Sequence, residues 1–247
     1  MEGKRHPRTL LATGLGAMTV NVLRLTTAIL CCYINASCII FHVRFSRIIL
    51  TFEKKTDKMP SPAPIEKHPF EPFLPEGARI LFLGSFPPQP FRWCMPFYYP
   101  NWINDFWRIM GLIFFGDKEH FCVAGEKRFD EALIRAFCTA EGLAFYDTAC
   151  EVRRLRNNAS DAFLEVVKAT DVPALLSRIT QCDTLVTTGQ KATEVIAATF
   201  RCAIPPIGGS IDLTIDGRTL HFWRMPSTSR AYPLALEKKA EAYRQLF

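Results

Sequence analysis

Two short stretches of the sequence carry the side chains best suited to chemistry. The first begins at Gly84-Ser85-Phe86-Pro87-Pro88 and continues into a loop dense in aromatic rings and asparagine. The second is Met225-Pro226-Ser227-Thr228-Ser229, close to the carboxyl terminus. Aromatic rings offer flat apolar faces, whereas asparagine amides and serine hydroxyls offer hydrogen-bond donors and acceptors. Such groups are typical of a ligand-binding cleft, provided that the fold brings the two stretches together.

The surrounding pattern predicts how these stretches are positioned. Four apolar runs are typical of buried strands, at 79–84, 143–147, 184–188 and 220–225. Segments with helical spacing alternate with these runs, at 102–112, 126–140, 172–179, 190–200 and 234–246. A hairpin that turns at Asp216-Gly217 is predicted for residues 203–220. We therefore expect an α/β protein, a three-layer α/β/α sandwich with a mostly parallel four-stranded central sheet. Ligands of such sheets bind beyond the carboxyl ends of the strands, where both stretches begin.

The two stretches together resemble motifs of the uracil-DNA glycosylase superfamily. The first matches a strand followed by a G-x-x-P turn, then an aromatic residue at Tyr99 and the helix start Asn104-Asp105-Phe106-Trp107. The second matches a strand that ends in x-P-S-x-S. The resemblance covers residues 78–247 and is closest to the mismatch-specific and hypoxanthine-type branches.

The resemblance implies an activity and a partner. It implies a DNA glycosylase of base-excision repair, which flips a deaminated base, uracil or hypoxanthine, out of DNA and hydrolyses its N-glycosidic bond. It implies double-stranded or single-stranded DNA as the partner, no cofactor, no metal and no obligate protein partner. We expect a monomer in the cytoplasm, associated with the nucleoid.

The resemblance also assigns roles to residues of the two motifs. It implies that Asn104 is catalytic, with Asp105 as a neighbouring substitute. The groups that contact the base would be Gly84, Ser85, Phe86, Pro87, Tyr99 and Asn101, and those that contact DNA would be Ser227, Thr228, Ser229 and Arg230. Asp147, at a neighbouring strand end, is a further candidate carboxylate. Arg153, Arg154 and Arg156, beside Asn157 and Asn158, form a basic patch that contacts phosphates or is simply a solvated face.

Several residues depart from the motifs or allow a structural interpretation. Phe86 stands where other branches place Asn or Asp, and Met225 where several place His. These departures favour an alternative, a catalytically inactive nucleic-acid-binding protein of the same fold. Asn104 could instead cap the helix, and Tyr99 could belong to the core. Asp147 could brace a loop, and the serine-rich stretch could close a turn.

Residues 1–58 differ in composition from the rest of the chain. They hold nine of the 30 Lys and Arg and three of the 24 Asp and Glu, so they account for the net charge of +6. Residues 25–43 lack charge and are long enough to span a bilayer, but polar side chains interrupt them. We favour a native start at Met59 over a membrane anchor or an ordered helix. A Pro-rich lead-in at 59–77 and the glycosylase-like domain at 78–247 follow.

The charge and cysteine content limit how the chain can bind nucleic acid or a metal. Because residues 59–247 are neutral overall, any binding of nucleic acid must use local basic patches rather than a global positive field. The nine cysteines include no C-x-x-C pair, which disfavours a zinc or iron–sulfur site. Free thiols in a reducing compartment are the better interpretation.

Overall fold

A computed structural model describes residues 63–156 and 161–247 of the chain. The apolar tract at 25–43, the rest of the leader 1–58, Asn157 and Asn158 lie outside these residues. Within the described ranges, no helix combines the length and the apolar character that crossing a membrane requires.

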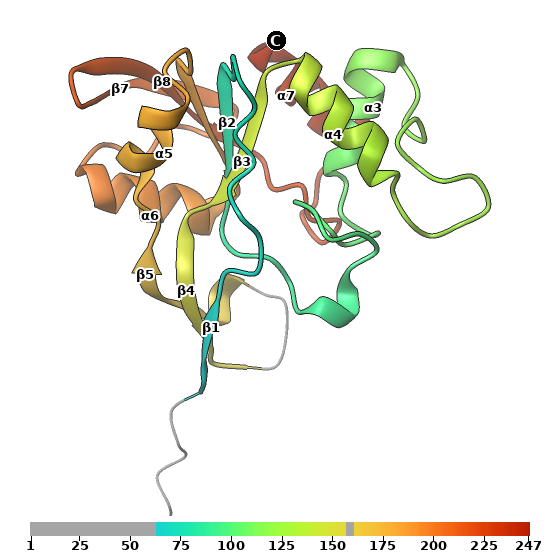
Figure 1. Cartoon of the computed structure of the whole chain (residues 1–247), viewed down its shortest axis with the longest axis horizontal. Coiled ribbons are helices and arrows are strands. Elements are labelled where there is room, and N and C mark those ends of the chain that lie inside the picture. The colour runs from blue at the N-terminus through green and yellow to red at the C-terminus, as the bar shows by residue number, and fades with distance from the viewer. Residues whose placement is uncertain (1–62, 157–160) are drawn as a thin grey trace, which may run out of the picture. The chain divides into compact units, whose positions relative to one another are not determined.

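A five-stranded sheet forms the centre of the fold (Figure 1). Its strand order is β3-β2-β6-β8-β7, from Leu143–Asp147, Ile80–Gly84, Thr184–Thr188, Arg218–Met225 and Gly209–Ile215. The first four strands are parallel, and β7 pairs antiparallel with β8. Strands β2 and β3 are buried along their whole length, as their apolar sequences predict. The α/β class and the four parallel strands are confirmed.

The predicted count of four strands in the sheet is wrong, because the hairpin adds a fifth. Strand β7 continues the sheet beyond β8 instead of standing apart from it. The turn lies at Asp216-Gly217 as expected, and both residues have positive φ, 49° and 77°. Aspartate and glycine tolerate this left-handed region, which a tight two-residue hairpin turn requires.

Helices flank the sheet on two sides in Figure 1, with α3, α4 and α7 on one side and α5 and α6 on the other. Their bounds are Phe106–Phe115, Glu131–Ala140 and Leu236–Tyr243 for the first group, and Val172–Arg178 and Gln190–Phe200 for the second. Helices α3 and α4 begin four to five residues later than predicted. Asp130 explains the start of α4, because its carboxylate accepts the backbone N–H of Leu133 and caps the helix.

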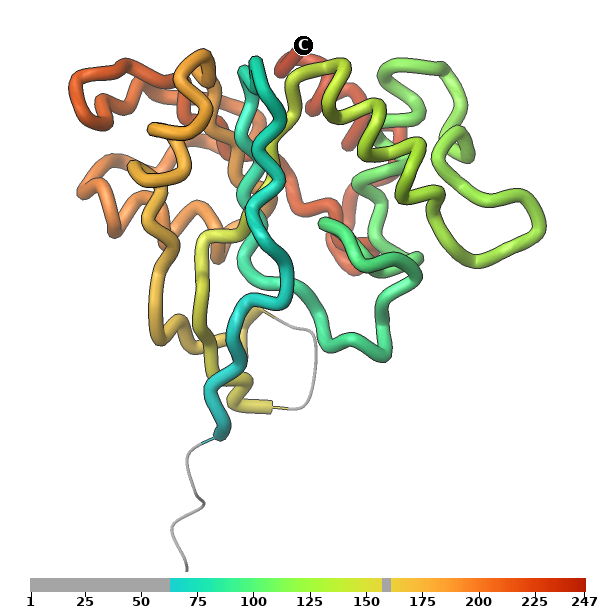
Figure 2. The backbone as a smooth tube through the Cα atoms, in the orientation of Figure 1, coloured from blue at the N-terminus to red at the C-terminus, as the bar shows by residue number. Residues whose placement is uncertain are grey.

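A second, antiparallel sheet was not predicted. It has the order β1-β4-β5, from Ile65–Lys67, Ala149–Arg154 and Leu164–Ala169. Only Thr148 separates β4 from the end of β3 in the central sheet. Residues 63–77, expected to be a lead-in, run along β4 and β3 (Figure 2), where His68 N–H donates to Cys150 O at 2.8 Å and Phe73 pairs with Phe145.

Aromatic rings fill the core between β2, β3 and α3. Phe82 stacks on Phe145 with ring centroids 5.4 Å apart, and Phe106 meets both rings edge-on. Phe97 and Trp107 extend this cluster and are almost fully buried. The ring-rich loop at 86–107 is thereby anchored to the sheet on one side, which fixes the residues that lie next to the strand ends.

Candidate active site

A cavity of about 490 Å³ lies beyond the carboxyl ends of β2, β3 and β6 and beside the turn that follows β8. This volume falls within the usual range for small-molecule sites. Eleven of the twelve residues assigned from the resemblance line it, namely Gly84, Ser85, Phe86, Pro87, Tyr99, Asn101, Asn104, Ser227, Thr228, Ser229 and Arg230. The two motifs, which the sequence separates by more than 110 residues, therefore share one cavity, which we call the main cavity.

Asp105 does not line the main cavity. Its carboxylate accepts from Lys239 Nζ at 2.9 Å and lies 3.5 Å from an Arg230 nitrogen. The side chains of Asp105 and Lys239 are only 9% and 1% exposed, so this is a buried ion pair. Lys239 Nζ also donates to Ser229 O at 2.8 Å. Asp105 thus holds the serine-rich turn against the start of α3 rather than facing the main cavity.

Asn104 contacts the start of α3 and also lines the main cavity. Its side-chain oxygen accepts the backbone N–H of Phe106, the first residue of α3, at 2.9 Å, although the N-cap position itself belongs to Asp105. The residue also lines the main cavity and pairs with Ser229 through a β-bridge. Because the Asn104 side-chain oxygen already accepts a hydrogen bond from the helix, its amide N–H₂ group is the one that can donate to a ligand.

Tyr99 also belongs to the core and to the main cavity at once. Its ring stacks on Phe106 at 3.9 Å with an interplanar angle of 4°, so one face of the ring is occupied. Its hydroxyl lies 2.9 Å from Thr188 Oγ1, at the end of β6. Burial raises the pKa of Tyr99 well above its ordinary value, so the hydroxyl stays protonated. The positive φ of 52° shows that the loop holds the residue in an uncommon backbone conformation.

The G-x-x-P turn is held tightly against strand β3. A Cβ atom on Gly84 would lie 2.4 Å from Asp147 Oδ1, so only glycine leaves room for that carboxylate. Ser85 Oγ donates to Asp161 Oδ1 at 2.8 Å, which ties the turn to an exposed residue at the edge of the cavity. Phe86 lies at the wall and packs edge-on against His68 at 5.4 Å without filling the cavity.

Asp147 and His68 form a pair beside this turn. Asp147 Oδ2 accepts from His68 Nε2 at 2.9 Å, and their side chains are 11% and 3% exposed. Sequence reasoning considered Asp147 but missed His68 and Asp161. No local spacing signals the pair, because its two residues are 79 positions apart and His68 lies in the lead-in.

The serine-rich turn is stabilised by its own side chains. Ser227 Oγ accepts the N–H of Ser229, and Ser229 Oγ accepts the N–H of Ala231. Tyr243 of α7 donates its hydroxyl to Pro226 O at 2.8 Å. The turn interpretation is therefore correct for these hydroxyls, while the same residues also face the main cavity.

Two arginines of the basic patch, Arg153 and Arg154, lie on β4 and are engaged in contacts within the protein, whereas Arg156 lies beyond the strand. Arg154 binds Glu66 at 2.9 Å, donates to Pro87 O at 2.6 Å and lies 5.6 Å from the Phe86 ring centroid. Its side chain is 8% exposed, so it braces the G-x-x-P turn. Arg153 pairs with Glu165 at 3.3 Å.

The described cysteines are all free thiols: Cys94, Cys122, Cys138, Cys150, Cys182 and Cys202. Burial raises the pKa of the Cys182 thiol to about 11, which keeps it protonated at neutral pH. Among residues 63–156 and 161–247, no three His, Cys, Asp or Glu side chains gather as metal ligands would.

Comparison with known proteins identifies a structural relative. No family model and no curated protein matches the sequence. The solution NMR structure of a provisionally assigned uracil DNA glycosylase from Methanosarcina acetivorans does match, with a TM-score of 0.51 and 20% identity. The match covers 74% of this chain and 98% of that one. At this identity the likeness shows the fold alone: the chain has an α/β fold similar to that of the Methanosarcina protein.

Proposed function

We propose that this protein is a monofunctional DNA glycosylase that hydrolyses the N-glycosidic bond of uracil or hypoxanthine in DNA. The observation that carries the proposal is that Tyr99, Asn104 and the serine-rich turn line one cavity, although the sequence separates them widely. The partner is DNA, bound by a monomer with no cofactor.

The chemistry of the main cavity fits a nucleobase that has left the helical stack. Base flipping costs a few kcal/mol, and contact with aromatic rings recovers about 1–3 kcal/mol per base. Because Phe106 covers one face of Tyr99, the base would contact the part of this ring that Phe106 leaves uncovered, together with the Phe86 ring. The donors best placed for the negative charge on the departing base are the Asn104 amide and the backbone of the G-x-x-P turn.

The outer part of the cavity fits a DNA strand. Ser229 and Arg230 are exposed beside it and offer a hydroxyl and a guanidinium group to phosphates. Arg230 also lies 3.5 Å from the buried carboxylate of Asp105, which limits where its head group can lie. We assign these residues to DNA contact and the inner residues to the base.

The alternative is a nucleic-acid-binding protein without catalysis. Two observations favour it: Phe86, which cannot orient water, lies at the cavity wall, and the Asn104 oxygen already accepts a helix N–H. Both functions predict DNA binding, but only the enzyme predicts an abasic product.

One experiment separates the two functions. The full-length protein is incubated with oligonucleotides that carry U:G, U:A, hypoxanthine:T or uracil in a single strand, and alkali then cleaves any abasic site. We expect strand breaks at the modified base, and we expect Asn104→Ala to reduce them while the circular-dichroism spectrum stays unchanged. Binding with intact strands on every substrate would favour the alternative, and neither binding nor cleavage would overturn both.

A further inference from the structure

Asp147 lines the main cavity, and its contacts with the protein hold its carboxylate in place. The residue ends β3, its side chain is 11% exposed, and its backbone oxygen accepts from Thr170 Oγ1 at 2.6 Å. The Oδ2 atom is bound to His68 Nε2. The Oδ1 atom lies against Gly84, at the start of the G-x-x-P turn. The carboxylate therefore stands beside the motif position at which Phe86 offers no polar group.

The His68 ring is held on several sides. Its Nδ1 lies 2.8 Å from Phe70 O and 3.2 Å from Phe70 N. The ring packs against Tyr146 at 4.5 Å and against Phe86 at 5.4 Å. Whether Nδ1 donates to the carbonyl or accepts from the amide, Nε2 carries a hydrogen, because the Asp147 carboxylate can only accept. His68 thus donates to Oδ2 and leaves Oδ1 for a ligand.

The geometry points to Asp147 as the carboxylate that activates the attacking water, with His68 as its positioning residue. This inference rests on the proposed glycosylase function and assigns its missing proton acceptor. The Asn104 amide is a poor acceptor of a proton, and its oxygen is bound to the helix start. The two residues therefore have different roles: Asn104 donates a hydrogen bond to the departing base, and Asp147 accepts a proton from the attacking water.

The bonds broken and formed in this hydrolysis can be followed with Asp147 as the proton acceptor. The bond between C1′ and the base nitrogen breaks, and its electron pair leaves with the base. The water oxygen forms the new bond to C1′, and one water proton passes to Asp147 Oδ1 and then to solvent. The base takes up a proton from solvent as it departs, so the products are the free base and an abasic site. The carboxylate also stabilises the positive charge that develops on the sugar.

The test uses single-turnover kinetics with excess full-length protein on the oligonucleotide that the wild type cleaves best. This design separates the maximal rate from the half-saturating protein concentration. We expect Asp147→Asn, which keeps the size of the side chain, to lower the maximal rate by about 10²–10⁴-fold. The half-saturating concentration should stay within about threefold of the wild-type value, because substrate binding uses other groups.

Two variants of His68 test its positioning role. His68→Phe keeps a ring among Tyr146 and Phe86 but removes the donor, and we expect a maximal rate about 10–100-fold lower. His68→Gln can place an N–H near the position of Nε2 and should recover the rate to within about threefold of the wild type. A merely structural role for His68 predicts no such rescue, and thermal unfolding of each variant reports on folding separately.

The outcomes distinguish this inference from the proposed function. A wild-type protein that cleaves no substrate overturns both. An active wild type with an equally active Asp147→Asn variant overturns the inference alone. His68→Phe and His68→Gln variants with equal rates, at the wild-type level or below it, overturn the positioning role.

Discussion

The buried pair between Lys239 and Asp105 gives the sharpest prediction for stability. Lys239 Nζ makes two hydrogen bonds, to Asp105 at 2.9 Å and to Ser229 O at 2.8 Å, and its side chain is 1% exposed. Lys239→Met keeps most of the apolar stem but leaves the Asp105 carboxylate buried without its closest cation. Removing one partner of a buried pair costs about 3–5 kcal/mol. For a domain of this size, that cost corresponds to a fall in Tm of about 6–20 °C.

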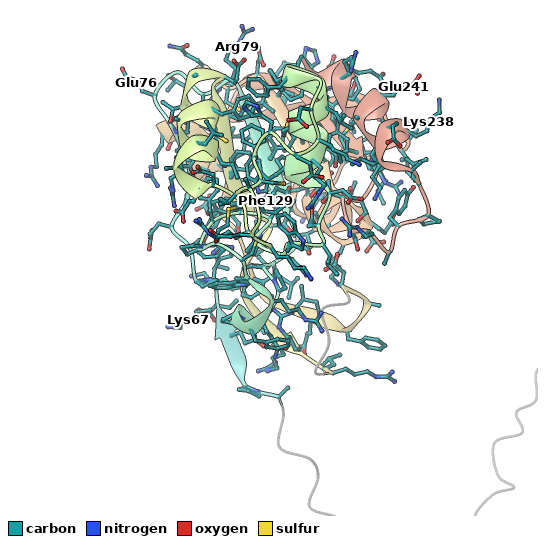
Figure 3. All side chains as sticks on the ribbon, turned by 90° about the vertical axis from the view of Figure 1, so that its right-hand side faces the viewer. Lys67, Glu76, Arg79, Phe129, Lys238 and Glu241 are labelled. Carbon is teal, nitrogen blue, oxygen red and sulfur yellow. The ribbon has the colours of Figure 1, made fainter. Side chains whose placement is uncertain are left out.

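The neighbouring residue supplies a matched control on the same helix. Lys238 binds Glu241 at 2.7 Å, but both side chains are about 70% exposed and lie at the outer edge of α7 (Figure 3). Because solvent screens such a pair, Lys238→Met should leave the Tm unchanged within error. Urea and thermal unfolding followed by circular dichroism measure both variants. Adding Asp105→Asn to Lys239→Met should restore part of the stability, since it removes the unpaired charge. Equal Tm values for the Lys238 and Lys239 variants would refute the reasoning.

Three further predictions concern the main cavity and the buried tyrosines. Gly84→Ala brings a methyl group to 2.4 Å from Asp147 Oδ1. We expect the variant to fold but to cleave oligonucleotides at least about tenfold more slowly than the wild type. Full activity of the variant would contradict this prediction. Tyr99→Leu keeps an apolar contact with Phe106 but loses the ring, and it should weaken binding of base-modified DNA by about tenfold in fluorescence anisotropy, with unmodified DNA as the control. Burial raises the pKa of Tyr99 and Tyr243, so the stability that their protonated forms contribute is complete below about pH 10 and is lost as the pH rises further. Tyrosinate absorbance from these residues should therefore appear together with the loss of the circular-dichroism signal, and ionisation in a protein that is still folded would contradict this.

The central sheet could be predicted because each of its parallel strands is encoded locally. Strands β2, β3 and β6 are short runs of apolar residues that end in glycine, aspartate or threonine, and burial on both faces requires such runs. The second sheet has no comparable signal. Strand β1 is only Ile65–Lys67, and β4 carries Glu and Arg at its half-buried positions. Strand β1 forms because it pairs with β4 across more than 80 residues, which local patterns do not encode. Strands β4 and β5 are neighbours in the sequence, but their mixed polar and apolar residues lack the clear alternation that signals a hairpin.

In the candidate site too, some positions could be predicted from the sequence and others could not. Motif residues such as Tyr99 and Asn104 lie at the main cavity because a motif records positions that share a site. The orientation of Asp105 away from the main cavity could not be predicted, since it depends on Lys239 from the last helix. The contact of His68 with the main cavity's Asp147 could not be predicted for the same reason, because Asp147 ends a strand 79 positions away.

The two motifs are joined by bonds that also stabilise the fold, so the geometry of the site and the stability of the protein share the same groups. Asp105 N–H donates to Thr228 O at 2.9 Å, and Asn104 pairs with Ser229 through the backbone. Helix α7 secures this junction through Lys239. A change at Lys239 should therefore move Asn104 relative to the serine-rich turn, even though Lys239 does not line the main cavity. If the protein is the proposed glycosylase, the cleavage rate of Lys239→Met relative to the wild type, measured well below the Tm of the variant, should fall; an unchanged rate would show that this junction serves folding alone.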